Sequence, residues 1–157
     1  MGMNYYLRQK RTELLELPLE DVLREGYVPA GPQTVRVYAD VRCHIAKTSW
    51  GWKPSFQAVP SHLPFDGQAE ADKVFSIRSV RDIRNYYGTG RYEIVDEDGE
   101  AYSWEEFETR VLHWEDRMRD ICEARGMNGF EPRTHMEGDL GDFVDPEGYE
   151  FCTTCFC

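Results

Sequence analysis

The chain has 157 residues, which is enough for one ordinary domain with a core and short for two. Hydrophobic residues make up 41% and aromatic residues 13%, too many for a disordered chain. No apolar run approaches the roughly 18 residues of a membrane helix, and the N-terminal stretch lacks the apolar core of a signal peptide. We therefore predict a single domain over residues 1–157 that stays in the cytoplasm.

The charge is distributed unevenly along the chain. Residues 1–90 carry 12 Lys and Arg against 10 Asp and Glu, and residues 91–157 carry 6 against 19, so the two parts contribute +2 and −13 to the net charge of −11. An acidic surface of this kind either serves solubility or docks on a basic partner. Direct nucleic-acid binding is disfavoured, because the phosphate backbone would be repelled.

The first half of the chain predicts mainly strands. A short strand is expected over residues 4–8, and a helix is expected to begin at Pro18 and end at Gly26. The clearest strand covers residues 35–45, and residues 55–59 are expected to be its partner in a hairpin. One face of that strand is apolar and consists of Val35, Val37, Ala39, Val41, Cys43 and Ile45. The other face is solvent-exposed or functional and consists of Arg36, Tyr38, Asp40, Arg42 and His44.

The second half predicts two capped helices and two turns. Ser79 is expected to cap a helix through Tyr87, and Ser103 to cap the longest helix, which ends at Gly126. A hairpin is expected over residues 92–103, with Asp98-Gly99 at its turn and a solvated acidic cluster around it. The longest helix presents an apolar stripe of Trp104, Phe107, Val111, Trp114, Met118 and Ile121.

The C-terminal part is expected to be irregular over residues 126–142. A type I turn, Asp145 to Gly148, then joins residues 143–144 to a last strand over residues 149–157. The fold class that follows is α+β, with a small antiparallel sheet packed against one long and one or two short helices.

The end of the best strand gathers side chains suited to binding a ligand. His44 points away from the apolar face, Lys47 and Ser49 suit an anion, and two tryptophans suit stacking on a base. The candidate ligand-binding set is Arg42, His44, Lys47, Ser49, Trp50 and Trp52. The structural alternative is a β-turn with a surface histidine, its tryptophans closing the edge of the core. His62, His113 and His135 have no spaced partner and are expected to be structural.

The five cysteines are not expected to form a disulfide framework, because three of them lie in the last six residues and the cytoplasm is reducing. Cys152 and Cys155 form a CxxC motif, which a structural zinc site would complete with Cys157 and Cys43. Free thiols and a redox pair are the alternatives. No other cofactor is expected.

Several short motifs along the chain resemble a family of small, uncharacterised bacteriophage proteins with YYLR and HIGKSSxGWxF patterns. They are Tyr5 to Arg8, His44 to Trp52 with Phe56, Ile94 to Glu100 before the capped helix, and Asp145 to Phe151. Ala46 stands where the family tends to have glycine, and the CxxC that its members often carry between the first two motifs is absent. That absence argues against an ancestral metal site at this place, and the C-terminal CxxC is the alternative location for one. The resemblance implies a phage origin and the host cytoplasm, and no known activity.

Three functions follow as hypotheses. The first is a non-enzymatic accessory protein that binds a host macromolecule, such as a host protein, through its acidic surface or the His44–Trp52 loop. The second is a binding or sequestering protein for a small, nucleotide-like ligand. The third is a metal-dependent hydrolase that uses His44, for which the sequence groups no set of ligands. The oligomeric state is left open.

Overall fold

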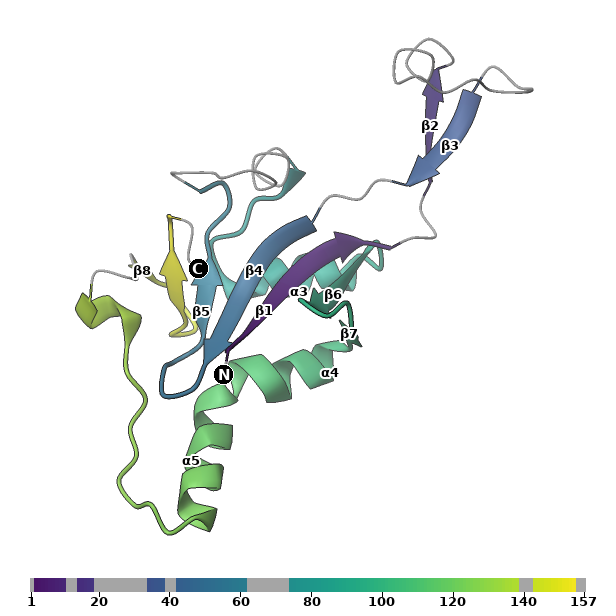
Figure 1. Cartoon of the computed structure of the whole chain (residues 1–157). Helices are drawn as coiled ribbons and strands as arrows, with labels where there is room; N and C mark the ends of the chain where they lie inside the picture. The colour runs from purple at the N-terminus through teal and green to yellow at the C-terminus, as the bar shows by residue number, and fades with distance from the viewer. Residues whose placement is uncertain are drawn as a thin grey trace.

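The computed structural model describes residues 2–10, 14–18, 34–38, 42–61, 74–138 and 143–154 (Figure 1). It combines a seven-stranded sheet, a two-stranded ribbon and helices. In chain order the elements are β1 (Gly2–Gln9), β2 (Leu14–Pro18), β3 (Thr34–Tyr38), β4 (Arg42–Ser49), β5 (Ser55–Gln57), α3 (Val80–Gly88), β6 (Tyr92–Asp96), β7 (Ala101–Tyr102), α4 (Trp104–Phe107), a π-helical segment (Glu108–Leu112), α5 (Trp114–Ala124), a 3-10 turn (His135–Gly138), β8 (Phe143–Val144) and β9 (Glu150–Cys152).

The strand order of the large sheet is β7-β6-β1-β4-β5-β9-β8. The α+β class is therefore confirmed, as are the predicted strand at residues 4–8 and the β4–β5 hairpin. The prediction of a purely antiparallel sheet is wrong at one pair, because β9 runs parallel to β5. In the described part of the chain no helix is long and apolar enough to cross a membrane.

The predicted strand over residues 35–45 is wrong as a single element. Its first part is β3, which pairs with β2 in the separate ribbon, and its last part is β4, at the centre of the large sheet (Figure 1). Pro18 ends β2 instead of beginning a helix. The rest of that predicted helix, residues 19–26, lies outside the described residues.

The core lies where one face of the sheet meets α3, α4 and the π-helical segment. Tyr5 and Leu7 of β1, Ile83 of α3, and Phe107 and Val111 of the long helical region are all buried in one cluster. Successive residues of a strand point to opposite faces, so Asn4, Tyr6 and Arg8 lie on the face that turns away from this core. The register of β1 with β4 shifts between Tyr5 and Tyr6.

The capping predictions are confirmed. The Ser79 hydroxyl accepts the backbone N–H of Asp82, and Ser103 and Glu106 form a complete capping box. The longest helix is interrupted by the π-helical segment, beyond which Figure 1 shows α5 turning away from α4. Gly126 follows α5 with φ +75°, a conformation that suits glycine, and so ends the helical region as expected.

Both predicted turns are present, and each is organised by a buried aspartate. In the β6–β7 hairpin, Asp96 is 3% exposed and accepts the Tyr102 hydroxyl at 2.6 Å, so the prediction that this acid belongs to a solvated turn is wrong. In the turn that begins at Asp145, the carboxylate accepts the backbone N–H groups of Glu147 and Tyr149. Its other oxygen accepts the N–H of Val80, the first residue of α3.

Candidate functional site

The predicted ligand-binding residues are spread along β4 and the turn after it. Arg42 is exposed at the first residue of the strand, whereas Ser49 is its last residue and Trp50 begins the turn. At about 3.3 Å per residue, Arg42 and Trp50 lie roughly 25 Å apart. One nucleotide-sized ligand does not span that distance, so the six predicted residues do not form one site.

His44 lies on the sheet face away from the core, as predicted, but it is not exposed there. Its side chain is buried, at 8% exposure, and its ring stacks on Tyr6 of β1 with centroids 5.0 Å apart. Burial, with a smaller contribution from the charge of Lys47, lowers the pKa of His44 to about 4, against a smaller opposing effect of the backbone at Ala46. The imidazole is therefore neutral at pH 7 and adds no positive charge for a phosphate.

The residues at the other end of β4 form an aromatic cluster with the helical region. Trp50 contacts Trp114 of α5 edge to face, with centroids 6.4 Å apart, and stacks on Phe130 at 6.2 Å. The indole N–H of Trp114 donates to the carbonyl oxygen of Ser49 at 3.2 Å. The β4–β5 turn is thereby fixed against the beginning of α5, as Figure 1 shows.

The segment after α5 runs back along this turn and holds it from the other side. The backbone N–H of Arg133 donates to the carbonyl of Gly51, and the N–H of Lys53 donates to the carbonyl of Arg133. Trp52 stacks on His135 with centroids 5.0 Å apart, beneath the guanidinium of Arg133 at 5.5 Å. Sequence reasoning missed these contacts, because the segment is irregular and has no periodic signal.

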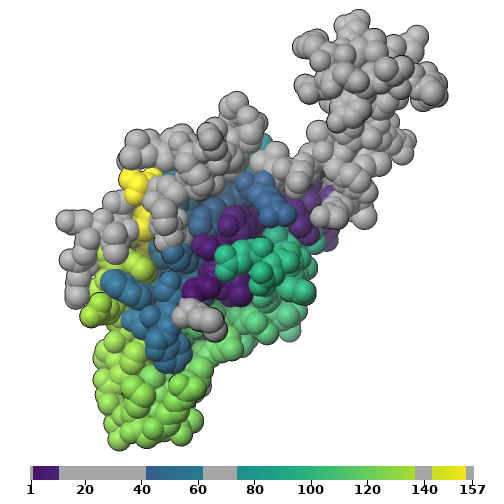
Figure 2. All heavy atoms as spheres, viewed as in Figure 1, coloured from purple at the N-terminus to yellow at the C-terminus, as the bar shows by residue number. Residues whose placement is uncertain are grey.

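What remains accessible is an apolar surface at one end of the molecule, where the blue β4–β5 turn meets the green helical region in Figure 2. Trp50 is 43% exposed and Met127 is 54% exposed. We name the Trp50 surface after its four residues, Trp50, Trp114, Met127 and Phe130. A shallow groove of about 200 Å³ continues it, lined by Arg119, Glu123, Met127, Gly129, Phe130 and Glu131.

The charges in this groove are unequal. The guanidinium of Arg119 lies 3.3 Å from a carboxylate oxygen of Glu131, 3.5 Å from one of Asp116 and 3.8 Å from one of Glu115. Its single positive charge is thus shared among three acids. Within the described residues Glu123 has no ion-pair partner, so the groove beside Met127 carries more negative than positive charge. Cations lie at the other side of the Trp50 surface, where Arg117 stands over the Trp114 ring at 5.8 Å and Lys53 is 4.0 Å from Glu115.

The predicted zinc ligands are only partly described. Cys43 of β4 and Cys152 of β9 are buried, and β5 lies between their strands. At about 4.8 Å per strand they are about 10 Å or more apart, too far for sulfurs that would each lie about 2.3 Å from one zinc ion. Cys155 and Cys157 lie outside the described residues. Across the described ranges, no three His, Cys, Asp or Glu side chains are grouped to hold a metal.

Comparison with protein families, with curated proteins and with solved structures finds no match to this chain.

Proposed function

We propose that the chain is a non-enzymatic binding protein that docks on a partner protein through the Trp50 surface. The observation that carries this proposal is the exposure of Trp50 and Met127 in a cluster whose aromatic rings are already packed. Tryptophan and methionine are enriched in the buried centres of protein interfaces, and a few such residues supply most of the binding energy. Stacking on Phe130 orders Trp50 before binding, which reduces the entropy lost on association.

The acidic groove beside Met127 indicates the chemistry of the partner. Three carboxylates already share Arg119, and Glu123 remains available at the edge of the groove. A partner segment that inserts an apolar side chain beside Met127 and places a lysine or arginine near Glu123 would complement both features. In this proposal the partner is a host protein and the chain is an accessory protein of a phage; the family resemblance implies the phage origin and no activity.

The nucleotide-binding alternative required Arg42 and Trp50 to contact the same ligand, and the length of β4 places these residues too far apart for that. The metal-dependent hydrolase stays a hypothesis. A surface of exposed aromatic and methionine side chains suits a macromolecular partner better than either of these alternatives does.

Selection of random peptides on the purified full chain tests the proposal. Selected peptides are expected to carry an apolar residue next to lysine or arginine, and fluorescence polarisation then measures their affinity. Trp50→Ala and Met127→Ala should each weaken binding at least about tenfold, because each removes a side chain at the centre of the surface. Glu123→Gln should weaken it severalfold and reduce its salt dependence.

Val144→Ala is the matched control, because Val144 is 49% exposed but lies on the edge strand β8. It should leave peptide affinity unchanged. Circular dichroism melts establish that each variant is folded. Peptides that bind wild type, Trp50→Ala and Met127→Ala equally would rule out this surface, as would the absence of any enriched sequence.

A further inference from the structure

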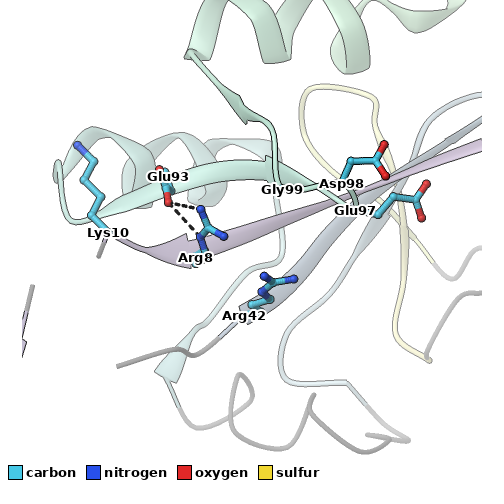
Figure 3. Close-up of a pocket in the computed structure, with 7 residues that line it drawn as sticks. All are labelled: Arg8, Lys10, Arg42, Glu93, Glu97, Asp98 and Gly99. Carbon is cyan, nitrogen blue, oxygen red and sulfur yellow. Dashed lines mark hydrogen bonds and ion pairs between the residues drawn. The ribbon is translucent and has the colours of Figure 1, made fainter. Parts of the chain in front are cut away.

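A second, chemically different surface lies on the sheet face that turns away from the core. It is an open groove of about 720 Å³ across β1, β4 and the β6–β7 hairpin (Figure 3). Its charged lining consists of Arg8, Lys10, Arg42, Glu93, Glu97 and Asp98. We name it the charged groove. It is separate from the Trp50 surface. Of the predicted ligand-binding residues, it includes Arg42 alone.

Strand register places two arginines directly opposite each other in this groove. Arg8 pairs across the sheet with Arg42 of β4 on one side and with Glu93 of β6 on the other. Like charges directly opposite on neighbouring strands are destabilising, so such a pair needs a compensating anion. Glu93 supplies one carboxylate, which is engaged with Arg8.

The ion pair leaves part of the Arg8 guanidinium available. Nε and Nη2 donate to the same oxygen of Glu93 at 3.0 Å and 2.6 Å, and the Arg8 side chain is only 11% exposed. Figure 3 shows the third nitrogen, Nη1, facing away from Glu93. Neither Arg42 nor Lys10 forms an ion pair with any residue in the described part of the chain, and both are exposed. This end of the groove therefore has three cations and one carboxylate.

The other end of the groove is anionic. Glu97 and Asp98 stand on the hairpin turn beyond Arg42 in Figure 3. One Glu97 oxygen accepts the side-chain amide of Asn4 at 3.2 Å, which orients the carboxylate from β1. These acids repel a polyanion such as a nucleic acid, and they attract an ammonium group.

We propose that the charged groove binds a small zwitterion with an oxyanion at one end and an ammonium group at the other. Arg42 and Nη1 of Arg8 hold the oxyanion, since guanidinium groups match the geometry of phosphate and carboxylate. Lys10 lines the same end of the groove, but its ammonium group points away from both arginines (Figure 3) and adds only positive charge nearby. Glu97 and Asp98 hold the ammonium group. The volume falls within the range of small-molecule sites.

The test titrates the full chain with O-phosphoethanolamine, 4-aminobutyrate and inorganic phosphate, by calorimetry and by amide NMR shifts. Saturable shifts are expected at residues 8–10, 42 and 97–99 with at least one of the two zwitterions. Tighter binding of O-phosphoethanolamine would identify the oxyanion as a phosphate, and tighter binding of 4-aminobutyrate would identify it as a carboxylate. Failure of both zwitterions to bind would overturn the proposal.

Three variants separate specific binding from general attraction between charges. Arg42→Gln should lower the affinity for the preferred zwitterion about tenfold, which is the effect of losing one charge-assisted hydrogen bond. Glu97→Gln should lower the affinity for the zwitterion severalfold, and the affinity for inorganic phosphate should stay the same or rise. Arg125→Gln is the control, because Arg125 is exposed just after α5. Equal weakening by Arg42→Gln and Arg125→Gln would overturn the proposal.

Discussion

Replacing Asp145 with asparagine is expected to lower the free energy of unfolding by about 2–4 kcal/mol. The carboxylate is 5% exposed and accepts three backbone N–H groups, from Val80, Glu147 and Tyr149, at 2.8–3.0 Å. It thus closes its own turn and satisfies an N–H at the start of α3, 65 residues away in sequence. An asparagine amide nitrogen would face one of these donors instead of accepting from it.

Urea unfolding followed by circular dichroism measures this loss, and Glu147→Gln is the matched control. Glu147 lies in the same turn, but its side chain is 38% exposed, and among the described residues its carboxylate pairs with the guanidinium of Arg84, at 3.4 Å. Exposed ion pairs of this kind contribute about 0–1 kcal/mol. If the two variants lost the same stability, the three backbone hydrogen bonds of Asp145 would not be the cause.

Replacing Asp96 with asparagine is expected to cost about 2–3 kcal/mol at pH 7. One carboxylate oxygen accepts the Tyr102 hydroxyl at 2.6 Å, and the other accepts the N–H groups of Asp98 and Glu100 at 2.9 and 3.0 Å. Tyr102→Phe removes one of these donors and should cost about 1–2 kcal/mol. Because the two groups contact each other, the double variant should lose less than the sum.

The effect of Asp96 should depend on pH. Burial alone would raise the pKa of the Asp96 carboxyl, but the Tyr102 hydroxyl and the backbone N–H groups outweigh it and lower the pKa. A folded-state pKa below the unfolded one stabilises the protein above the unfolded pKa, and this contribution is lost as pH falls through the folded pKa. The difference in the free energy of unfolding between wild type and Asp96→Asn should therefore become smaller below about pH 4.

Unfolding midpoints measured from pH 7 down to pH 2.5 check this dependence. Asp98→Asn is the control, because Asp98 is exposed in the same turn. At pH 7 this variant should lose less stability than Asp96→Asn, because the Asp98 side chain is exposed. If the difference in stability between wild type and Asp96→Asn stayed constant down to the lowest pH, the lowered pKa of Asp96 would be contradicted.

Features with a local cause could be predicted from the sequence. The caps at Ser79 and Ser103 need only residues three positions apart, and the turns near Gly99 and Gly148 need only a glycine at positive φ. The helical stripe from Trp104 was also visible, because its side chains recur at helical spacing.

Features created by distant contacts could not be predicted. Alternation placed His44 on the face away from the core, but the sequence does not show that its ring stacks on Tyr6 or that it is buried there. Arg8 had no signal as a site residue, because the charged groove requires β6 to lie beside β1. The parallel pairing of β9 with β5 has no local cue of any kind.

The strand order also has a consequence for how the chain folds. Two of its central contacts join residues that are far apart in sequence, with Arg8 paired to Glu93 and Phe56 paired to Phe151. The entropy of closing such long loops is lost before the contacts they permit are gained. Chains dominated by distant pairings fold on the order of milliseconds to seconds, whereas helical bundles need microseconds to milliseconds. Formation of the large sheet, rather than of its helices, is therefore expected to limit the folding rate.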